Sequence, residues 1–174
     1  VPGKGVVGIE VPNTIANMVV LRELMEGEVW NSRKARLPLA LGKDVGGSDI
    51  IADLADMPHL LVAGATGSGK TVCMNSILVG LLMARTPEEL RLLLVDPKIV
   101  EFSSYNHLPH LIAPVITNPK KVGLGLRWAI NEMERRYKLF ARAGVRNIEG
   151  YNHRMIAEQE PLFPNEPVAE KKDE

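Results

Sequence analysis

The sequence predicts an α/β fold with a mainly parallel β-sheet. Short, continuously apolar segments alternate with longer segments whose apolar residues recur at helical spacing, as in α/β proteins. One such pair, an apolar run at 59–63 and a helical pattern at 70–85, is joined by a glycine-rich loop. The chain has 174 residues, 45% of them hydrophobic and 24% charged, which is enough for one core domain.

Short elements are expected before this loop. The first is a strand over 6–11, followed by a helix over 15–27, where apolar residues lie at helical spacing. Two further strands are expected at 37–41 and 49–54, because Gly46-Gly47 between them is typical of a hairpin turn. The chain therefore reaches the loop through a hairpin.

The segment directly before the loop is expected to be a central strand of the sheet. The run at 59–63 is continuously apolar after its histidine, which suits a parallel strand buried on both faces. After the helix at 70–85, buried strands are expected at 91–95 and 111–116. A long helix is expected to begin at Asn118-Pro119 and to run to about Ala143.

The glycine-rich loop is the most specific motif in the sequence. Its residues are Gly64, Ala65, Thr66, Gly67, Ser68, Gly69, Lys70 and Thr71, which match Gly, four residues, Gly-Lys and then Ser or Thr. Glycines let the backbone approach a phosphate without a Cβ in the way. Their N–H groups and the positive end of the following helix form an anion cradle. All eight residues are predicted to bind a nucleoside triphosphate, of which ATP is favoured.

Four side chains, two in this loop and two after the segment at 91–95, carry the predicted chemistry. Lys70 and Thr71 are the candidate catalytic residues, since the lysine can reach the β- and γ-phosphates and the threonine hydroxyl can bind Mg²⁺. Asp96 and Glu101 are candidate cofactor-binding residues, because the ends of parallel strands face the ligand crevice. A turn acid and a solvated glutamate remain the alternative for these two. Asp96 does not begin Asp-x-x-Gly and no Asn-Lys-x-Asp motif occurs, which disfavours GTP.

Composition bears on the partners and the cellular compartment of the protein. The net charge is zero, so composition alone gives no argument for a nucleic-acid or membrane partner. Cys73 is the single cysteine, which excludes an internal disulfide and suits a reducing compartment. No apolar run approaches the length of a membrane span, so no membrane contact is expected from this segment. The chain opens on Val1, and we expect it to be a fragment of a longer protein.

Several segments of the sequence, one of which contains the loop, together form a pattern that is specific for one protein family. They lie at 8–13, 41–44, 57–71, 96–101, 131–137, 144–147 and 151–152. With the loop they resemble the N-terminal part of the motor ATPase domain in the FtsK/SpoIIIE family of bacterial double-stranded-DNA translocases. The resemblance covers about residues 2–155.

The resemblance implies a P-loop NTPase with a RecA-like, three-layer fold around a mainly parallel sheet. It implies ATP and Mg²⁺ as cofactors, and double-stranded DNA and further copies of the chain, in a hexameric ring, as partners. The implied role is DNA movement during chromosome segregation and cell division. The motor domain would be cytoplasmic, in a protein anchored in the inner membrane by an upstream segment.

The resemblance also implies the domain limits. Residues 1–36 would be the end of a preceding domain and its connection, 37–157 the N-terminal part of the ATPase core, and 158–174 a mobile loop or tail. The family's second acidic motif, an apolar strand ending Asp-Glu, is expected beyond Glu174. The fold would then be incomplete at its C-terminal end, and hydrolysis by this chain alone stays open.

Two other functions stay open at this point. A stand-alone P-loop kinase for a small molecule is compatible with the length, although the segment from Glu158 offers no basic residue before Lys171 for a catalytic lid. A non-catalytic nucleotide-binding fragment is compatible with the loop alone. The basic residues around Arg136 could face DNA or a neighbouring nucleotide, but a solvated helix face paired with Glu132 is favoured.

Overall fold

The computed structural model describes residues 17–32 and 34–154, together with the single positions 5, 7, 9, 11, 14 and 15. The chain divides into two compact units, one that ends at Asn118 and one that begins at Pro119. Each unit is described by itself. The strand expected at 6–11 lies partly outside the described residues, and the tail expected at 158–174 lies wholly outside them. The domain limits expected from the sequence stay predictions.

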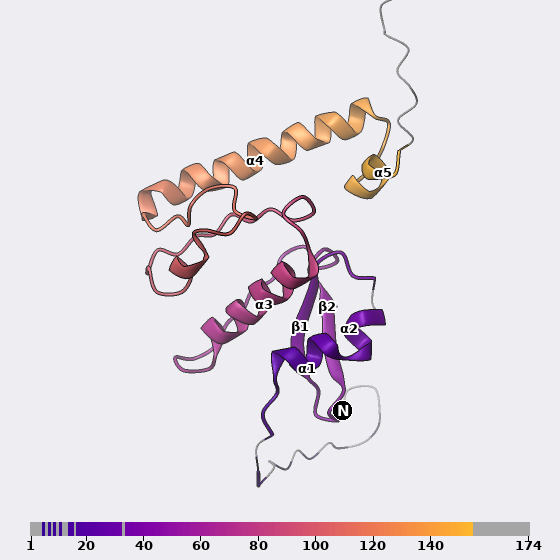
Figure 1. Ribbon diagram of the computed structural model, residues 1–174, viewed down its shortest axis with the longest axis vertical. Helices are drawn as coiled ribbons and strands as arrows, with labels where there is room; N and C mark the ends of the chain where they lie inside the picture. The colour runs from indigo at the N-terminus through magenta and orange to yellow at the C-terminus, as the bar shows by residue number, and fades with distance from the viewer. Residues whose placement is uncertain are drawn as a thin grey trace, which may run out of the picture. The chain divides into compact units, whose positions relative to one another are not determined.

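The first unit is built on a β-hairpin, as the sequence predicted. Strand β1 (Pro38–Lys43) pairs with β2 (Asp49–Asp53) in antiparallel register (Figure 1). The carboxylate of Asp44 accepts the backbone N–H groups of Gly46 at 2.8 Å and Ser48 at 2.9 Å. This side chain therefore closes the turn that the glycine pair indicated.

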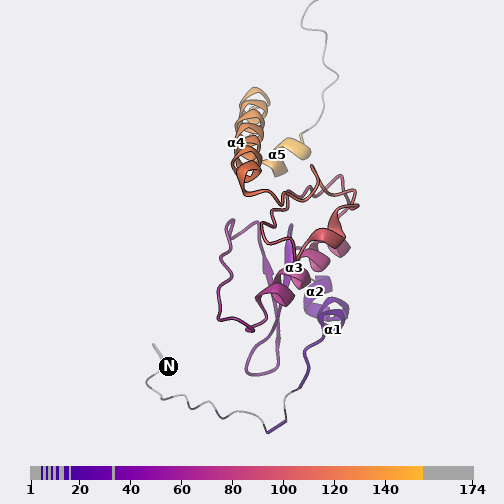
Figure 2. The same ribbon diagram turned by 90° about the vertical axis from the view of Figure 1, so that its left-hand side faces the viewer.

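One face of the hairpin packs against helix α3 (Lys70–Ala84). Leu39, which is 0% exposed, forms a buried cluster with Ile77 and Leu81 of that helix. Both side chains on α3 lie one turn apart, so they share the face that meets the strand. The helix expected at 70–85 is confirmed, and Figure 1 and Figure 2 both show it beside the hairpin.

The opposite face of the hairpin packs against two short helices. Because side chains alternate along a strand, Ala40 points away from α3. It lies in a second cluster with Ile51 and with Leu24 of helix α1 (Leu21–Glu26). Helix α2 (Glu28–Ser32) follows directly and contacts β2. The helix expected over 15–27 therefore begins later, at Leu21, and the hairpin has helices on both faces.

A third cluster joins α3 to the segments after it. Leu78 of α3 packs with Leu94, Phe102 and Val115. The segments at 91–95 and 111–116 pair in parallel through two bridges. In one, the N–H of residue 112 donates to the carbonyl of residue 92, and in the other, the N–H of residue 96 donates to the carbonyl of residue 116. The strands expected at these two segments are present only as two isolated parallel bridges.

The sheet differs from the mainly parallel one that the sequence predicted. In the described part of the chain, its strands are the two antiparallel strands of the hairpin. Residues 59–63 were predicted to be a central strand, but in the described part of the chain they form no strand, and Leu61 is 90% exposed. A central strand needs hydrogen-bonding partners on both sides, and no segment among the described residues forms a β-bridge with 59–63.

In residues 119–154, which the structure describes, the second unit consists of two helices. Helix α4 (Pro119–Arg142) begins at the proline, as predicted, and is followed by Gly144, whose φ of 64° is the left-handed conformation that ends many helices. The side chain of Asn147 then accepts the N–H of Gly150 at 2.8 Å and caps helix α5 (Ile148–Asn152). The long helix and its stop are confirmed.

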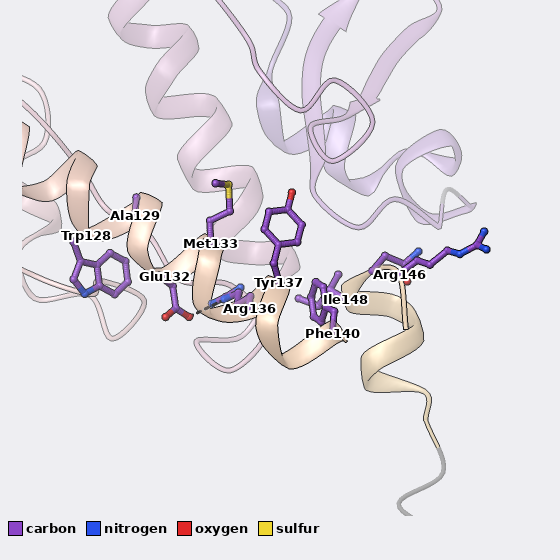
Figure 3. A pocket seen from close by; sticks show the side chains of 10 residues that line it. Trp128, Ala129, Glu132, Met133, Arg136, Tyr137, Phe140, Arg146 and Ile148 are labelled. Atoms are coloured by element: carbon purple, nitrogen blue, oxygen red, sulfur yellow. Dashed lines mark hydrogen bonds and ion pairs between the residues drawn. The ribbon is translucent and has the colours of Figure 1, made fainter. Parts of the chain in front are cut away.

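Helix α4 carries a stripe of apolar side chains at helical spacing, and this stripe is exposed. No residue of α4 is buried, and the stripe includes Met133 and Tyr137 among its exposed members. Together with α5 it lines a groove of about 560 Å³, whose floor includes Trp128 and Phe140 (Figure 3). Among the described residues of this unit, the short α5 is the element beside the stripe, and it is too short to cover 24 helical residues.

Candidate phosphate-binding site

The phosphate loop lies in the first unit, directly before α3. Lys70, the first residue of that helix, donates from Nζ to the carbonyl oxygens of Gly64 at 2.7 Å and Ala65 at 2.8 Å. The N–H of Ser68 donates to the Ala65 carbonyl at 3.1 Å, which closes a tight turn. The loop is thus curled around the ammonium group of its own lysine.

Two glycines permit this path. Gly67 and Gly69 have φ values of 81° and 91°, which only glycine adopts without strain. Gly64 lies close to Ser68, whose hydroxyl would have to move to accommodate a Cβ there. The backbone geometry therefore requires glycine at positions 67 and 69.

The start of α3 offers hydrogen-bond donors. Gly69 is its N-cap, and no side chain caps the helix there. The first N–H groups of a helix have no partner within it, and the helix dipole makes that end positive. The amides from Lys70 onward are therefore suited to an anion such as a phosphate group.

Thr71 and Glu101 lie together, although 30 positions separate them in the sequence. The hydroxyl Oγ1 of Thr71 donates to Oε1 of Glu101 at 2.7 Å. Glu101 is half-buried, whereas Thr71 is exposed. Two of the residues that the sequence singled out are thus brought into direct contact.

Asp96 shapes the turn that carries Glu101. Its carboxylate is 4% exposed, and Oδ2 accepts the N–H groups of Glu101 at 2.9 Å and Phe102 at 3.1 Å. Oδ1 accepts those of Lys98 and Ile99. The N–H of Glu101 lowers the pKa of Asp96, burial raises it, and the other three N–H groups lower it further, so it lies below its ordinary value.

The turn also contains a strained residue. Ile99 has a φ of 59°, a conformation that costs a side chain with a Cβ roughly 1–2 kcal/mol. The N–H of Ile99 donates to the Asp96 carboxylate, and this bond helps to hold it there. The described contacts of Asp96 are with the turn, and its direct contact with a nucleotide stays a prediction.

A second connection, through two residues that the sequence did not single out, links the turn to α3. Tyr105 donates from its hydroxyl to Oδ1 of Asn75 at 2.7 Å, and Nδ2 of Asn75 donates to the backbone carbonyl of Thr71 at 2.9 Å. An asparagine one helical turn after Thr71 is the feature of the sequence that could have indicated it.

The residues at the loop fit a magnesium nucleotide. In the described part of the chain, no three His, Cys, Asp or Glu side chains gather where they could hold a metal ion. Mg²⁺ bound with a nucleotide needs few protein ligands, because phosphates and water supply most of its coordination. One hydroxyl, that of Thr71, beside a backbone cradle of glycines matches this requirement.

Membrane insertion has no candidate in the described residues. None of their helices combines the length and the apolar character that a bilayer crossing requires.

Comparison with known proteins gives a consistent result. Residues 20–168 match the FtsK/SpoIIIE family. The chain is 55% identical over 152 residues, or 87% of its length, to a DNA translocase FtsK of Clostridium acetobutylicum, of which it covers 20%. It is 52% identical over 159 residues to a DNA translocase FtsK of Caldanaerobacter subterraneus, covering 91% of this chain and 22% of the relative.

A DNA translocase SpoIIIE of Bacillus subtilis is 51% identical over 152 residues, which is 87% of this chain and 19% of the relative. The chain thus spans about a fifth of the curated relatives that it matches. The family match covers most of the chain and includes the phosphate loop with its flanking turn. The resemblance found in the sequence is confirmed: this chain belongs to the FtsK/SpoIIIE family of P-loop NTPases.

Proposed function

We propose that this chain is the ATP-binding part of a DNA translocase motor, which moves double-stranded DNA during chromosome segregation and cell division. The observation that carries the proposal is the phosphate loop, from Gly64 to Thr71, in a chain about half identical to proteins named DNA translocases. The alternative of a stand-alone small-molecule kinase is not favoured, because the relatives carry no such name.

The proposal includes the architecture of the intact motor. We expect the complete domain to have a RecA-like, three-layer fold with a mainly parallel sheet, and to work as a hexameric ring on DNA in the cytoplasm, in a protein anchored in the inner membrane. Two features support the layered fold: helices pack on both faces of the hairpin, and the segments at 91–95 and 111–116 pair in parallel. A parallel pair of this kind is typical of three-layer α/β folds.

Within the site, each residue has a proposed task. The amides of the loop and of the first turn of α3 hold the phosphates, and Lys70 exchanges its bonds to the Gly64 and Ala65 carbonyls for bonds to phosphate oxygens. Thr71 offers its hydroxyl oxygen to Mg²⁺. The metal, when bound, neutralises negative charge that develops on the phosphates during hydrolysis.

The central test is Lys70→Ala. Losing a charge-assisted contact to phosphate costs about 1.5–3 kcal/mol of binding free energy, so the affinity for ATP should fall by about 10- to 100-fold. Isothermal titration of the 174-residue chain with ATP measures it. Lys34→Ala removes an exposed lysine from the same unit and should leave the affinity unchanged.

The same substitution in the intact translocase tests the motor. DNA translocation should be lost in Lys70→Ala and retained in Lys34→Ala. Unchanged ATP affinity in the Lys70 variant would refute the assignment of the loop. ATP-driven DNA movement by an intact Lys70→Ala protein would refute its role in the motor.

A further inference from the structure

The bond between Thr71 and Glu101 has no part in the proposed function so far. Glu101 accepts a hydrogen bond from the Thr71 hydroxyl at 2.7 Å, a good distance for an O–H···O bond. Thr71 is the residue whose hydroxyl would contact Mg²⁺. A carboxylate therefore lies directly behind the one protein ligand proposed for the metal.

The position of Glu101 is built into the fold. Its own N–H is held by the buried carboxylate of Asp96, and the next residue, Phe102, is buried in the cluster that contains Leu78 of α3. The turn is tied to α3 again where Tyr105 bonds to Asn75. These contacts fix the backbone on both sides of Glu101 relative to the helix that begins at the phosphate loop.

The direction of the Thr71 proton decides what the hydroxyl can do. A hydroxyl has one proton and two lone pairs, and it binds a metal through a lone pair. If the hydroxyl donates its hydrogen bond to Glu101, its lone pairs are free to face the metal. The negative carboxylate also makes the hydroxyl oxygen a stronger electron-pair donor to the metal. Groups that hold a metal ligand in this way commonly change metal affinity by 10–100-fold.

We infer that Glu101 is a positioning residue that orients the Thr71 hydroxyl for Mg²⁺ and so makes the site prefer the magnesium complex of the nucleotide over the metal-free nucleotide. The inference rests on the proposed function, since it assumes that the loop binds ATP. Charge gives it a sign: the carboxylate repels the phosphates of metal-free ATP and attracts the metal of the complex.

The variant Glu101→Gln tests this inference. Glutamine keeps the shape and an acceptor oxygen but removes the negative charge. We expect the affinity for ATP in excess Mg²⁺ to fall by roughly 10-fold, while the affinity for ATP in EDTA falls by less than about 2-fold or rises. The ratio of the two affinities, measured by titration calorimetry, is the readout, and it does not depend on turnover.

Two controls make the result specific. Glu88→Gln makes the same chemical change at an exposed glutamate in the turn after α3, and should leave the ratio unchanged. In a Thr71→Ala background, Glu101→Gln should have no further effect on the ratio, because Glu101 acts through the hydroxyl that is missing. Such a double-mutant cycle isolates the coupling between the two side chains.

The outcomes separate the two proposals. If Glu101→Gln leaves the ratio unchanged, or lowers both affinities equally, Glu101 has a structural role at most and the inference is wrong. An effect of Glu101→Gln that persists in full in the Thr71→Ala background also overturns it. If Lys70→Ala leaves ATP binding unchanged, the proposed function itself fails, whatever the result at Glu101.

Discussion

Different kinds of contact stabilise the unit with the phosphate loop and, within itself, the helical unit that begins at Pro119. In the first, buried side chains from distant parts of the sequence meet, as Leu39 does with Ile77 and Leu81. In the second, no residue of α4 or α5 is buried, and the described contacts join near neighbours. Glu132 bonds to residues three and four positions away, and the rings of Phe140 and Tyr151 lie 5.6 Å apart.

This difference shows where the geometry of the site comes from. The turn that carries Glu101 is fastened to the core through Phe102 and the buried Asp96, so the site depends on long-range packing. The ion pairs of Glu132 in α4 would survive in an isolated helix, because their spacing is helical. Substitutions should therefore cost much in the first unit and little in the second.

The largest effect is expected for Leu39→Ala. It removes a side chain that is 0% exposed between β1 and α3, and leaves a cavity against Ile77 and Leu81. The free energy of unfolding of the first unit should fall by about 2–5 kcal/mol. Denaturant unfolding, read by hydrogen exchange of the α3 amides, measures it.

A matched truncation in α4 serves as its control. Leu124 is 64% exposed, and alanine is a good helix former, so Leu124→Ala should change stability by no more than about 0.5 kcal/mol. An equal loss from the two substitutions would show that the contrast between the units is wrong.

A smaller effect is expected for Asp53→Asn, at the end of β2. The carboxylate is 6% exposed and accepts the N–H groups of Arg36 at 2.7 Å, Leu37 at 2.9 Å and Ala55 at 2.9 Å. An amide there would set an NH₂ donor against N–H donors, which should cost about 1–3 kcal/mol of unfolding free energy. The neighbouring Asp56 is exposed, and Asp56→Asn should cost less than about 0.5 kcal/mol.

Asp53 should also give the unit a pH dependence. Burial raises its pKa, but the N–H groups of Leu37, Ala55 and Arg36 outweigh that, so its pKa in the folded chain lies below the usual 3.8. Its stabilising contribution is therefore complete well above pH 3.8 and is lost as the pH falls through the folded pKa. Unfolding curves of Asp53→Asn should lose this part of the acid dependence; an unchanged acid dependence would contradict the role of the carboxylate.

Local patterns in the sequence predicted the local parts of the fold. The start and stop of α4, at Pro119 and before Gly144, follow from residues next to each boundary. The phosphate loop was found for the same reason, because its chemistry is contained in eight consecutive residues.

Features that depend on distant partners were harder to predict. The apolar run at 59–63 indicated a buried strand, but apolar character does not say which backbone will supply its hydrogen bonds. The contact between Thr71 and Glu101 depends on the turn that Asp96 shapes, and on the bond from Tyr105 to Asn75, which no short motif describes.

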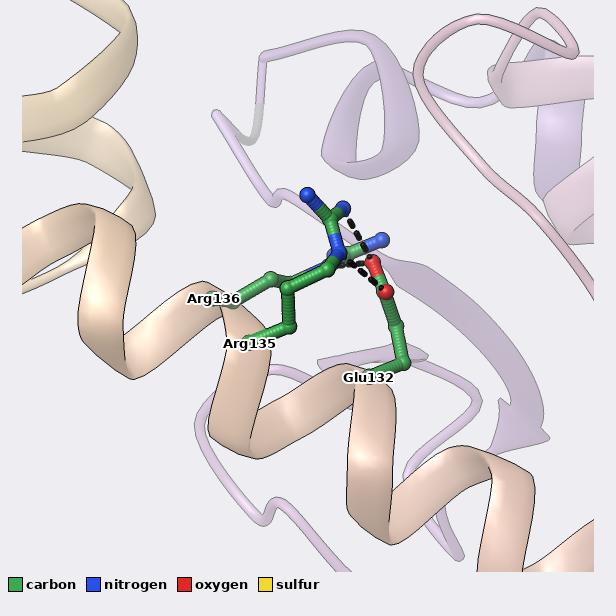
Figure 4. A network of polar contacts seen from close by, with 3 residues as sticks. All are labelled: Glu132, Arg135 and Arg136. Carbon is green, nitrogen blue, oxygen red and sulfur yellow. Dashed lines mark hydrogen bonds and ion pairs between the residues drawn. The ribbon is translucent and has the colours of Figure 1, made fainter.

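The smallest effect on stability is expected for substitutions in α4, at the ion pairs of Glu132 (Figure 4). Hydrogen bonds from Arg135, and then from Arg136, lower the pKa of this carboxyl from 4.5 to about 2. All three of these hydrogen bonds lie within the helix at 2.7–2.8 Å, so they should persist whatever happens to the hairpin core. An NMR titration of the Glu132 carboxyl should therefore give a pKa near 2 in the chain and an equally low value in Leu39→Ala.

Two further variants sharpen this test. Arg135 makes the larger contribution, so Arg135→Ala should raise the pKa of Glu132 further toward 4.5 than Arg136→Ala does. The stability of the chain should barely change in either, because exposed ion pairs contribute little to folding. A pKa of Glu132 that returned to 4.5 in Leu39→Ala would mean that the order of α4 depends on the hairpin core after all, since none of its described ion-pair partners lies outside the helix.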